Sequence, residues 1–229
     1  MVNSYTPPFQ SKLVRRLLNG QFAITAEITP PVSGLANDVL VRADPLKNLV
    51  DAVNVTDGPN ANVRMSSVAS SSILQANGIE PIAQFTCRDR NRIALLSDLL
   101  GTSAMGIQNL LILNGDDPSA GDQPEATPVF DLKSHELIEM AYKMTTQGII
   151  PSQSVKVTAQ GISTNTKSLK TPTKFFIGAA DTPIAEYSEK WFKGIKKKQL
   201  AGAQFIQTQL CYDLSVIRSY AKLLIEKGL

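Results

Sequence analysis

Three polar side chains stand inside or directly after apolar stretches of the sequence: Glu27, Asp116 and Gln209. Glu27 lies between Ala26 and Ile28, near the end of a stretch that stops at two prolines. Apolar surroundings disfavour the charged form of a carboxyl group, so a glutamate there can keep a proton near neutral pH and donate it as a general acid. A glutamate that faces water, or that forms a structural ion pair, explains the same pattern. The residues alone leave both interpretations open.

Asp116 and Gln209 have two interpretations each. Asp116 follows Asn114 and Gly115, and a glycine allows the backbone to approach a ligand closely. The alternative is a solvated turn in which the aspartate caps a helix. Gln209 lies in an otherwise apolar run, and a buried amide needs a partner, which is either a neighbouring strand or a ligand.

The one dense group of positive charge falls within six residues. It consists of Lys193, Lys196, Lys197 and Lys198. Such a group is either the solvated face of a helix or a subsite for an anionic ligand, such as the diphosphate of a cofactor.

Other chemistries find little support in the sequence. His135 is the only histidine, which argues against a serine-histidine triad and against a histidine-rich metal site. The two cysteines, Cys87 and Cys211, form neither a disulfide framework nor a zinc pattern. No Walker A loop occurs, and no G-x-G-x-x-G follows the first apolar stretch, so a flavin would have to be held in another way. We expect no metal.

Composition favours a globular protein of the reducing cytoplasm. The chain has 229 residues, of which 43% are hydrophobic, and a net charge of +3. Basic residues are spread along the chain with acidic residues between them, so the positive charge is weak evidence for nucleic-acid binding, and we expect no nucleic-acid partner. No apolar run has the length of a membrane span, and the first 16 residues lack the apolar centre of a signal peptide.

Strand-like and helix-like segments alternate along the chain. Strands are predicted at 22–29, 52–56, 82–86, 109–114, 174–180 and 205–212, and helices at 11–19, 61–76, 90–104, 134–146, 184–200 and 214–227. This alternation predicts a parallel sheet covered by helices. Because polar residues, glycine and proline follow the strands, we expect the site at the carboxyl ends of the strands.

The strand count predicts an α/β fold of the (β/α)8 TIM-barrel type that stops after its sixth βα unit. A full barrel has about eight strands, and an open one leaves the edges of its first and sixth strands unpaired. We interpret 1–229 as a single domain and favour a fragment over a gap covered by a partner. The polar stretch 149–174 interrupts the pattern, and we expect a surface excursion there, with an extra strand at 155–159.

Six segments carry a resemblance to a known family. They are AEITPP (26–31), VNVTDGPNANVRMSS (53–67), QFTCRDRNR (84–92), LILNGDDPSAGDQPEATPVFD (111–131), FFIGAA (175–180) and AGAQFIQTQLCYD (201–213). In this order and combination they resemble the methylenetetrahydrofolate reductase family. They extend over nearly the whole chain.

The resemblance implies a barrel with non-covalently bound FAD that reduces 5,10-methylenetetrahydrofolate to 5-methyltetrahydrofolate with NADH or NADPH, an oxidoreductase acting on CH-NH donors in one-carbon metabolism and methionine synthesis. Glu27 matches the family's general acid, Asp116 the acidic residue near flavin and pterin, and Gln209 an amide that contacts folate. The positions that match the flavin site are Thr56, Gln84, Leu113, Asn114, Gly115, Asp116 and, near the cofactor phosphates, Lys198.

The sequence departs from the family at two of these positions. Many members have a histidine where Gln84 stands and an arginine where Asn114 stands. These departures, and the short chain, keep a second reading open: a reductase-like subunit that is non-catalytic or depends on a partner, working with a methyl-transfer complex. Either a homo-oligomer or a partner subunit is expected. An unrelated aldolase-type barrel would need a Schiff-base lysine inside a strand, and none is evident.

Overall fold

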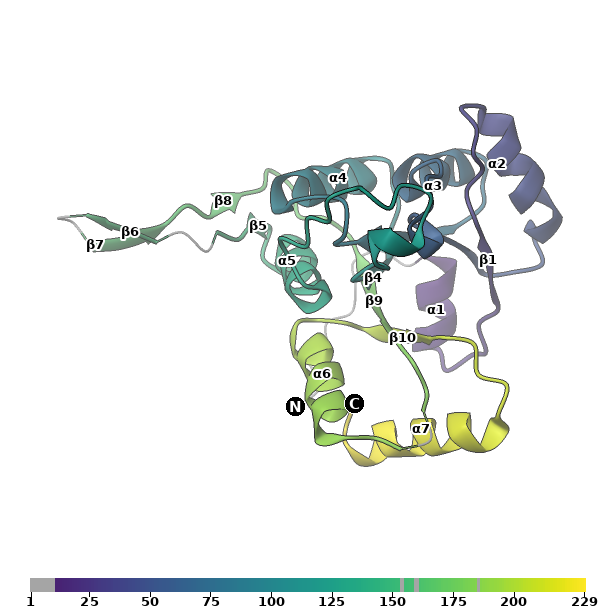
Figure 1. Ribbon diagram of the computed structural model, residues 1–229. Coiled ribbons are helices and arrows are strands. Elements are labelled where there is room, and N and C mark those ends of the chain that lie inside the picture. Colours follow the sequence, from purple (N-terminus) through teal and green to yellow (C-terminus); the bar gives the residue numbers. More distant parts are fainter. Residues whose placement is uncertain (1–10, 153–154, 159–160, 185) are drawn as a thin grey trace.

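A curled sheet of six parallel strands forms the centre of the protein (Figure 1). The structure is a computed structural model, and it describes residues 11–152, 155–158, 161–184 and 186–229. In spatial order the strands are β1 (Thr25–Ile28), β2 (Ala52–Val55), β3 (Pro81–Thr86), β4 (Asn109–Leu113), β9 (Phe176–Asp181) and β10 (Phe205–Thr208). Every neighbouring pair is parallel. Among the described residues β1 and β10 do not pair with each other, so the sheet is a half-barrel.

The predicted alternation of strands and helices is confirmed. The helices are α1 (Lys12–Leu18), α2 (Ala36–Ala43), α3 (Ser67–Ala76), α4 (Arg92–Ala104), α5 (Ser134–Thr146), α6 (Glu189–Leu200) and α7 (Leu214–Glu226). Short 3-10 turns lie at Asp44–Leu46, Pro59–Ala61 and Pro118–Ala120.

Side-chain caps explain where two helices begin later than predicted. The hydroxyl of Ser66 accepts a hydrogen bond from the Ala69 amide, which starts α3 six residues after the predicted position 61. Ser188 caps α6 in the same way through the Trp191 amide, five residues after the predicted position 184. The intervening residues form loops at the strand ends.

Helix α2 is absent from the predicted set. Its N-cap, Leu35, makes no side-chain hydrogen bond to the helix, so the usual starting signal is missing. Only Val39 and Ala43 are buried on it, a stripe too narrow to recognise. These two residues pack with Val53 and Val55 of β2 on the outer face of the sheet.

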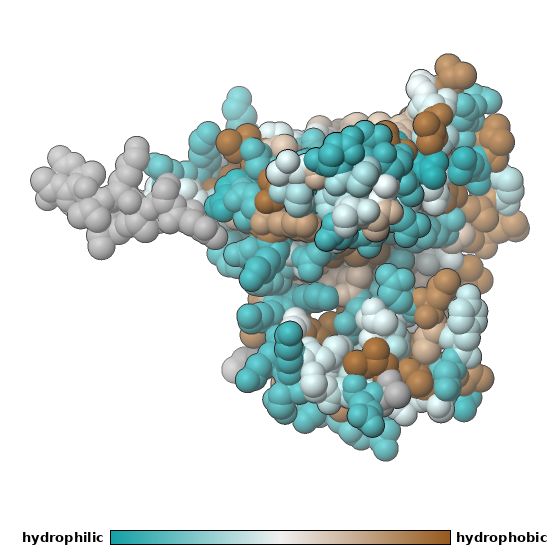
Figure 2. Space-filling model, in the orientation of Figure 1, coloured by the Kyte–Doolittle hydropathy of each residue, from teal (hydrophilic) through white to brown (hydrophobic). Residues whose placement is uncertain are grey.

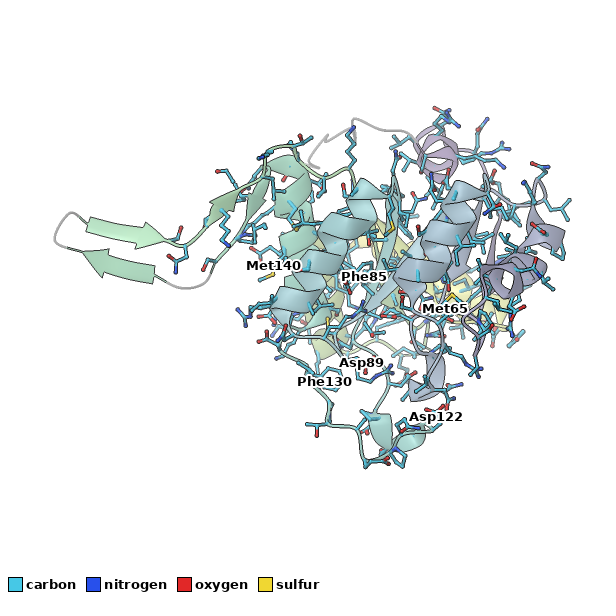
Figure 3. All side chains as sticks on the ribbon, turned by 90° about the horizontal axis from the view of Figure 1, so that it is seen from above. Met65, Phe85, Asp89, Asp122, Phe130 and Met140 are labelled. Atoms are coloured by element: carbon cyan, nitrogen blue, oxygen red, sulfur yellow. The ribbon has the colours of Figure 1, made fainter. Side chains whose placement is uncertain are left out.

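The two faces of the sheet have separate cores. On the outer face, Phe85 and Ile112 pack with residues of α4 and α5, and Figure 3 shows Phe85 between helices and sheet. On the inner face, Leu13 and Val14 of α1 pack against a layer formed by inward side chains of four strands: Ala52, Ile82, Leu111 and Phe176. Helix α1 therefore closes the amino-terminal end of the half-barrel, and the carboxyl end stays open.

A close fit joins the last two strands of the half-barrel. The rings of Phe176 and Phe205 stack with centroids 4.9 Å apart. The ring of Phe205 lies over Gly178, where an added Cβ would come within 2.3 Å of it. Phe205 can face the inner layer because residue 178 has no side chain.

The predicted excursion is present as two antiparallel pairs. β5 (Ile149–Ile150) pairs with β8 (Lys167–Ser168), and β6 (Val155–Thr158) pairs with β7 (Gly161–Thr164). Figure 1 shows the β6–β7 hairpin projecting away from the body. The predicted strand at 155–159 is confirmed as far as residue 158, and residue 159 lies outside the described residues.

Two further findings concern the surface. Within the described part of the chain, none of the helices combines the length and the apolar character needed to span a bilayer. The expectation about a signal peptide concerns residues 1–16, and residues 1–10 of that segment lie outside the described residues. Large hydrophobic side chains remain exposed on α7, among them Leu214 and Ile225, and Figure 2 shows brown residues over this part of the molecule.

Candidate active site

A carboxylate and two amides meet on the inner face of the half-barrel, above the layer that α1 closes. Glu27 lies directly opposite Asn54 in the register of β1 and β2. The Asn54 side chain donates from Nδ2 to Glu27 Oε2 at 2.7 Å, and Gln84 donates from Nε2 to the same oxygen at 3.4 Å. Parallel pairing in register brings these side chains from three strands to one place.

The apolar neighbours of Glu27 do not cover its carboxylate, so of the two interpretations left open the structure agrees with a glutamate that faces solvent. Side chains alternate between the faces of a strand, so Ala26 and Ile28 point to the outer face while Glu27 points inward. Glu27 is exposed in the open concavity, whereas Asn54 and Gln84 are 1% and 7% exposed. The carboxylate is therefore held by buried groups and accessible to a ligand.

Thr56 and Leu113 serve the frame of the sheet. The buried Thr56 donates its backbone N–H and its hydroxyl to the carbonyl of Ile28, at 3.3 and 3.4 Å. Leu113 packs against the inner layer of the half-barrel. Both lie at strand ends, as predicted, with their side chains engaged within the protein.

The loop after β4 follows a path that only a small residue permits. Gly115 has φ +98°, and an added Cβ would lie 2.9 Å from Cβ of Arg88. Asn114 before it accepts the Ser134 amide on its side-chain Oδ1 at 2.9 Å, and its carbonyl accepts the Cys87 amide at 3.0 Å. Asn114 thus ties its loop to the start of α5 and to the loop after β3.

Asp116 lies at the exposed end of this loop. Its Oδ2 accepts the backbone N–H of Asn60 at 2.9 Å, which links the loops after β2 and β4. The helix-cap alternative does not describe it, because the 3-10 turn that follows is capped by Asp117. One carboxylate edge is engaged, and the residue remains open to solvent.

Charged pairs also hold together the loops after β2, β3 and β4, which form one rim of the open end of the half-barrel. Asp57 Oδ2 accepts hydrogen bonds from the backbone N–H and hydroxyl of Thr86, at 2.9 and 3.0 Å, and from the guanidinium of Arg90. Arg90 also pairs with Asp98 at 2.9 Å. The loops after β2 and β3 are joined through this one carboxylate.

Arg88 is a buried cation with internal partners. It is 4% exposed, and its guanidinium bonds to both carboxylate oxygens of Asp89 and to the carbonyl of Gly58. The hydrogen bond to Asp89 raises the pKa of Arg88 above its ordinary value. Figure 3 shows Asp89 and Asp122 on the loops beyond the strands. Much of the charge in this segment is therefore structural.

The rim at β9 and β10 is built differently. Asp181, at the end of β9, accepts hydrogen bonds on Oδ2 from Trp191 Nε1 at 3.0 Å and from the Tyr220 hydroxyl at 2.9 Å. The rings of Tyr187, Trp191 and Tyr220 lie within about 6 Å of one another, centroid to centroid. Burial, followed by the bond to Asp181, raises the pKa of Tyr220.

Lys198 and Gln209 occupy this second rim. The Lys198 ammonium donates to the carbonyl of Ala180 at 2.6 Å, and burial lowers the pKa of this lysine. Its half-buried position differs from that of the exposed Lys193 and Lys197, so the lysine cluster is not one uniform solvated face. The exposed Gln209 lies just past β10, where its backbone N–H donates to the carbonyl of Asp181 at 2.8 Å.

The structure brings together some of the predicted residues and leaves others apart. Glu27 and Gln84 meet, but no hydrogen bond within the described part of the chain joins Glu27 to Asp116, Lys198 or Gln209. Asn54 was missed from the sequence. Its position could have indicated it, because Asn54 is a polar residue in an apolar strand and lies on the same face as Ala52 and Thr56.

A curled parallel sheet with a ligand-accessible carboxylate at the open carboxyl end has the architecture of barrel-type α/β enzymes. Residues 12–229 match the family described as Methylenetetrahydrofolate reductase, and the chain belongs to this family. The resemblance in the sequence is thereby confirmed, with a reductase-like oxidoreductase function. A search among curated proteins gives no match.

Proposed function

We propose that this chain reduces 5,10-methylenetetrahydrofolate to 5-methyltetrahydrofolate in an FAD-dependent reaction with NADH or NADPH as the electron donor. The observation that carries the proposal is the Glu27 carboxylate, fixed by Asn54 and Gln84 on the open inner face of a family member. Glu27 donates the proton that a folate nitrogen takes up when its bond to the methylene carbon breaks.

The groups around the open end suit a flavin. Gln84 offers an amide and Asp116 offers an exposed carboxylate at the same rim. Gly115 lets its loop pass close to Arg88, and Thr56, Leu113 and Asn114 form the frame. FAD, when bound, supplies the hydride-carrying chemistry between nicotinamide and folate.

Lys198 would meet the cofactor's diphosphate. Its ammonium donates to the Ala180 carbonyl, so binding a phosphate requires the side chain to turn or to share its protons. A phosphate neighbour would also favour the charged form, against which burial now acts. Asp116 and Gln209 would contact the pterin and the rest of the folate from the two rims.

The test is a flavin spectrum followed through both halves of the reaction. The protein reconstituted with FAD should lose its flavin absorbance when NADH or NADPH is added and regain it when methylenetetrahydrofolate follows. Glu27→Gln should keep the first step and lose the second, while Glu125→Gln, an exposed glutamate on a loop, should keep both. Unimpaired folate turnover in Glu27→Gln would remove this residue from the mechanism, and failure to bind FAD would remove the reaction.

One observation supports a second candidate, a reductase-like subunit that needs a partner. Among the described residues the outer edges of β1 and β10 are unpaired, and Glu27 and Gln209 are exposed between them. A second copy or a methyl-transfer subunit that covers this opening would complete the site. In that case the isolated chain binds FAD weakly, and binding improves when the partner is added. The two unpaired cysteines suit a reducing cytoplasm for either function.

A further inference from the structure

Asn54 stands in an unusual relation to Glu27. It lies directly across from Glu27 on the neighbouring strand, and its Nδ2 donates to Glu27 Oε2 at 2.7 Å. The residue is 1% exposed, so its amide has no access to bulk water. Gln84 reaches the same carboxylate oxygen from the next strand, at the longer distance of 3.4 Å.

The other end of the Asn54 amide has no partner. Its Oδ1 is buried and accepts no hydrogen bond from any residue that the structure describes. Buried polar atoms are paired in the great majority of cases, so an unpaired one calls for an explanation. The amide is thus held through its contact with Glu27 alone.

This arrangement lets the amide turn without losing another bond. Rotation by about half a turn about the terminal side-chain torsion exchanges the nitrogen and oxygen of an amide. With nitrogen toward Glu27, the amide donates to the ionised carboxylate. With oxygen toward Glu27, it accepts the proton of the neutral carboxyl group.

A general acid needs partners in both protonation states, since it holds a proton before the reaction and has lost it afterwards. From this geometry we infer that Asn54 is a positioning residue that holds Glu27 in both states by turning its amide. The inference rests on the proposed function, in which Glu27 supplies the proton. The other contact to the Glu27 side chain that the structure shows comes from Gln84, which is also uncharged, and Glu27 takes part in no ion pair of the described residues.

Two substitutions separate the donor and acceptor roles. Asn54→Leu has nearly the same shape and can neither donate nor accept. Asn54→Asp has the same size, cannot donate when ionised, and regains both roles when protonated. Asn37→Leu, on the exposed side of α2, is the matched control.

The rate to measure is reoxidation of the pre-reduced flavin by methylenetetrahydrofolate as a function of pH. Asn54→Leu should slow it on the order of 10- to 100-fold, the loss expected for a hydrogen bond to a charged group. Asn54→Asp should be slow near neutral pH and recover as the pH falls, because the pair of carboxyl groups then shares a proton. Flavin reduction by NADH should be unchanged in each variant, as should both steps in Asn37→Leu.

A second measurement needs no cofactor. In the protein without FAD, the carbon-13 chemical shift of the Glu27 carboxyl group should differ between Asn54→Leu and the unmodified chain, because the variant removes the Asn54 donor, and it should be unchanged in Asn37→Leu. If Asn54→Leu does not fold, Asn54→Asp carries both measurements.

The outcomes distinguish the two claims. In one outcome, Glu27→Gln is inactive while Asn54→Leu keeps the rate and pH profile of the unmodified chain. That result would overturn the role of Asn54 and leave the proposed function intact. Equal folate turnover in Glu27→Gln and the unmodified chain would overturn both.

Discussion

The two rims of the open end are fastened by different chemistry. At β2–β4, charged side chains join one loop to the next, with Asp57 as the shared acceptor for Thr86 and Arg90. At β9–β10, a single carboxylate, Asp181, receives the polar edges of aromatic side chains from α6 and α7. In the first rim, hydrogen bonds and ion pairs fix the loops to each other. The second fixes its helices to a strand.

This difference indicates which part of the site already has its final geometry before a ligand binds. Gly115 and Asp116 lie on loops with fixed neighbours, so the β2–β4 rim is preorganised for a rigid ligand. Lys198 and Gln209 lie on a rim whose polar groups are turned to backbone carbonyls or exposed to solvent. We expect ligand binding to rearrange the second rim more than the first.

The largest expected effect compares the thiols of the two rims. Burial raises the pKa of Cys87, at the first rim, to about 12, and the residue is 0% exposed. At pH 8 its thiolate fraction is on the order of one in 10,000, and access adds a further barrier. Cys211, past β10, is partly exposed. A disulfide reagent should detect one fast thiol in the native protein and two in denaturant.

Replacing Cys211 with serine is the control for this measurement. In this variant the fast reaction of Cys211 should be absent. The slow reaction of Cys87 should remain, at a rate limited by unfolding. Rapid modification of Cys87 in the native protein would show that the first rim opens readily.

Removing the carboxylate at the centre of the first rim should cost the most stability. Asp57→Ala removes the acceptor of the Thr86 amide and one of the two carboxylate partners of Arg90, and the side chains of Asp57 and Arg90 are both less than a fifth exposed. We expect a loss of about 3 kcal/mol in the free energy of unfolding, measured in urea. Asp98→Ala removes the more exposed partner of Arg90 and should cost less than about 1 kcal/mol.

A smaller loss is expected at the second rim. Tyr220→Phe removes the hydroxyl that donates to Asp181 and keeps the buried ring. The expected loss is about 2 kcal/mol, within the range for one hydrogen bond to a charged group. Tyr212→Phe, at an 89% exposed position, is the matched control and should change nothing measurable. Equal losses at both tyrosines would argue against the bond.

The smallest expected effect is on the stability of the protein at acid pH. Asp131 accepts hydrogen bonds from the Arg92 side chain and backbone, which lower its pKa from 3.8 to about 2. A carboxyl group whose pKa is lowered by folding stabilises the protein at pH values above its pKa in the unfolded chain. This contribution disappears as the pH falls through its pKa in the folded protein. The stability difference between the unmodified chain and Asp131→Asn should therefore be constant near neutrality and shrink between pH values of about 4 and 2.

Much of the frame could be predicted from the sequence because the strands are short, apolar and regularly spaced. Glu27 was found as a polar residue in an apolar strand, and Gln84 through the resemblance to the family; their meeting follows from parallel strands. The contact with Asn54 depends on register, which places residue 27 opposite residue 54 and which spacing along the chain does not encode.

Other features required tertiary information. The Asp181 cluster is assembled from residues 10 and 39 positions away, so no contiguous motif marks it. The sequence left the exposure of Glu27 open, because its apolar neighbours pack on the opposite face and do not show which side the carboxylate faces. In contrast, the charged segment from Thr86 to Arg92 was visible as a motif, although the bonds of Arg88 and Arg90 are internal to the protein.

The fit of Phe205 over Gly178 has an evolutionary consequence. Because an added Cβ at 178 would collide with the ring, residue 178 cannot become larger while Phe205 is present. Among descendants of this chain, a larger residue at 178 should appear only together with a smaller one at 205. The two positions are then inherited together, although they lie 27 positions apart in the chain.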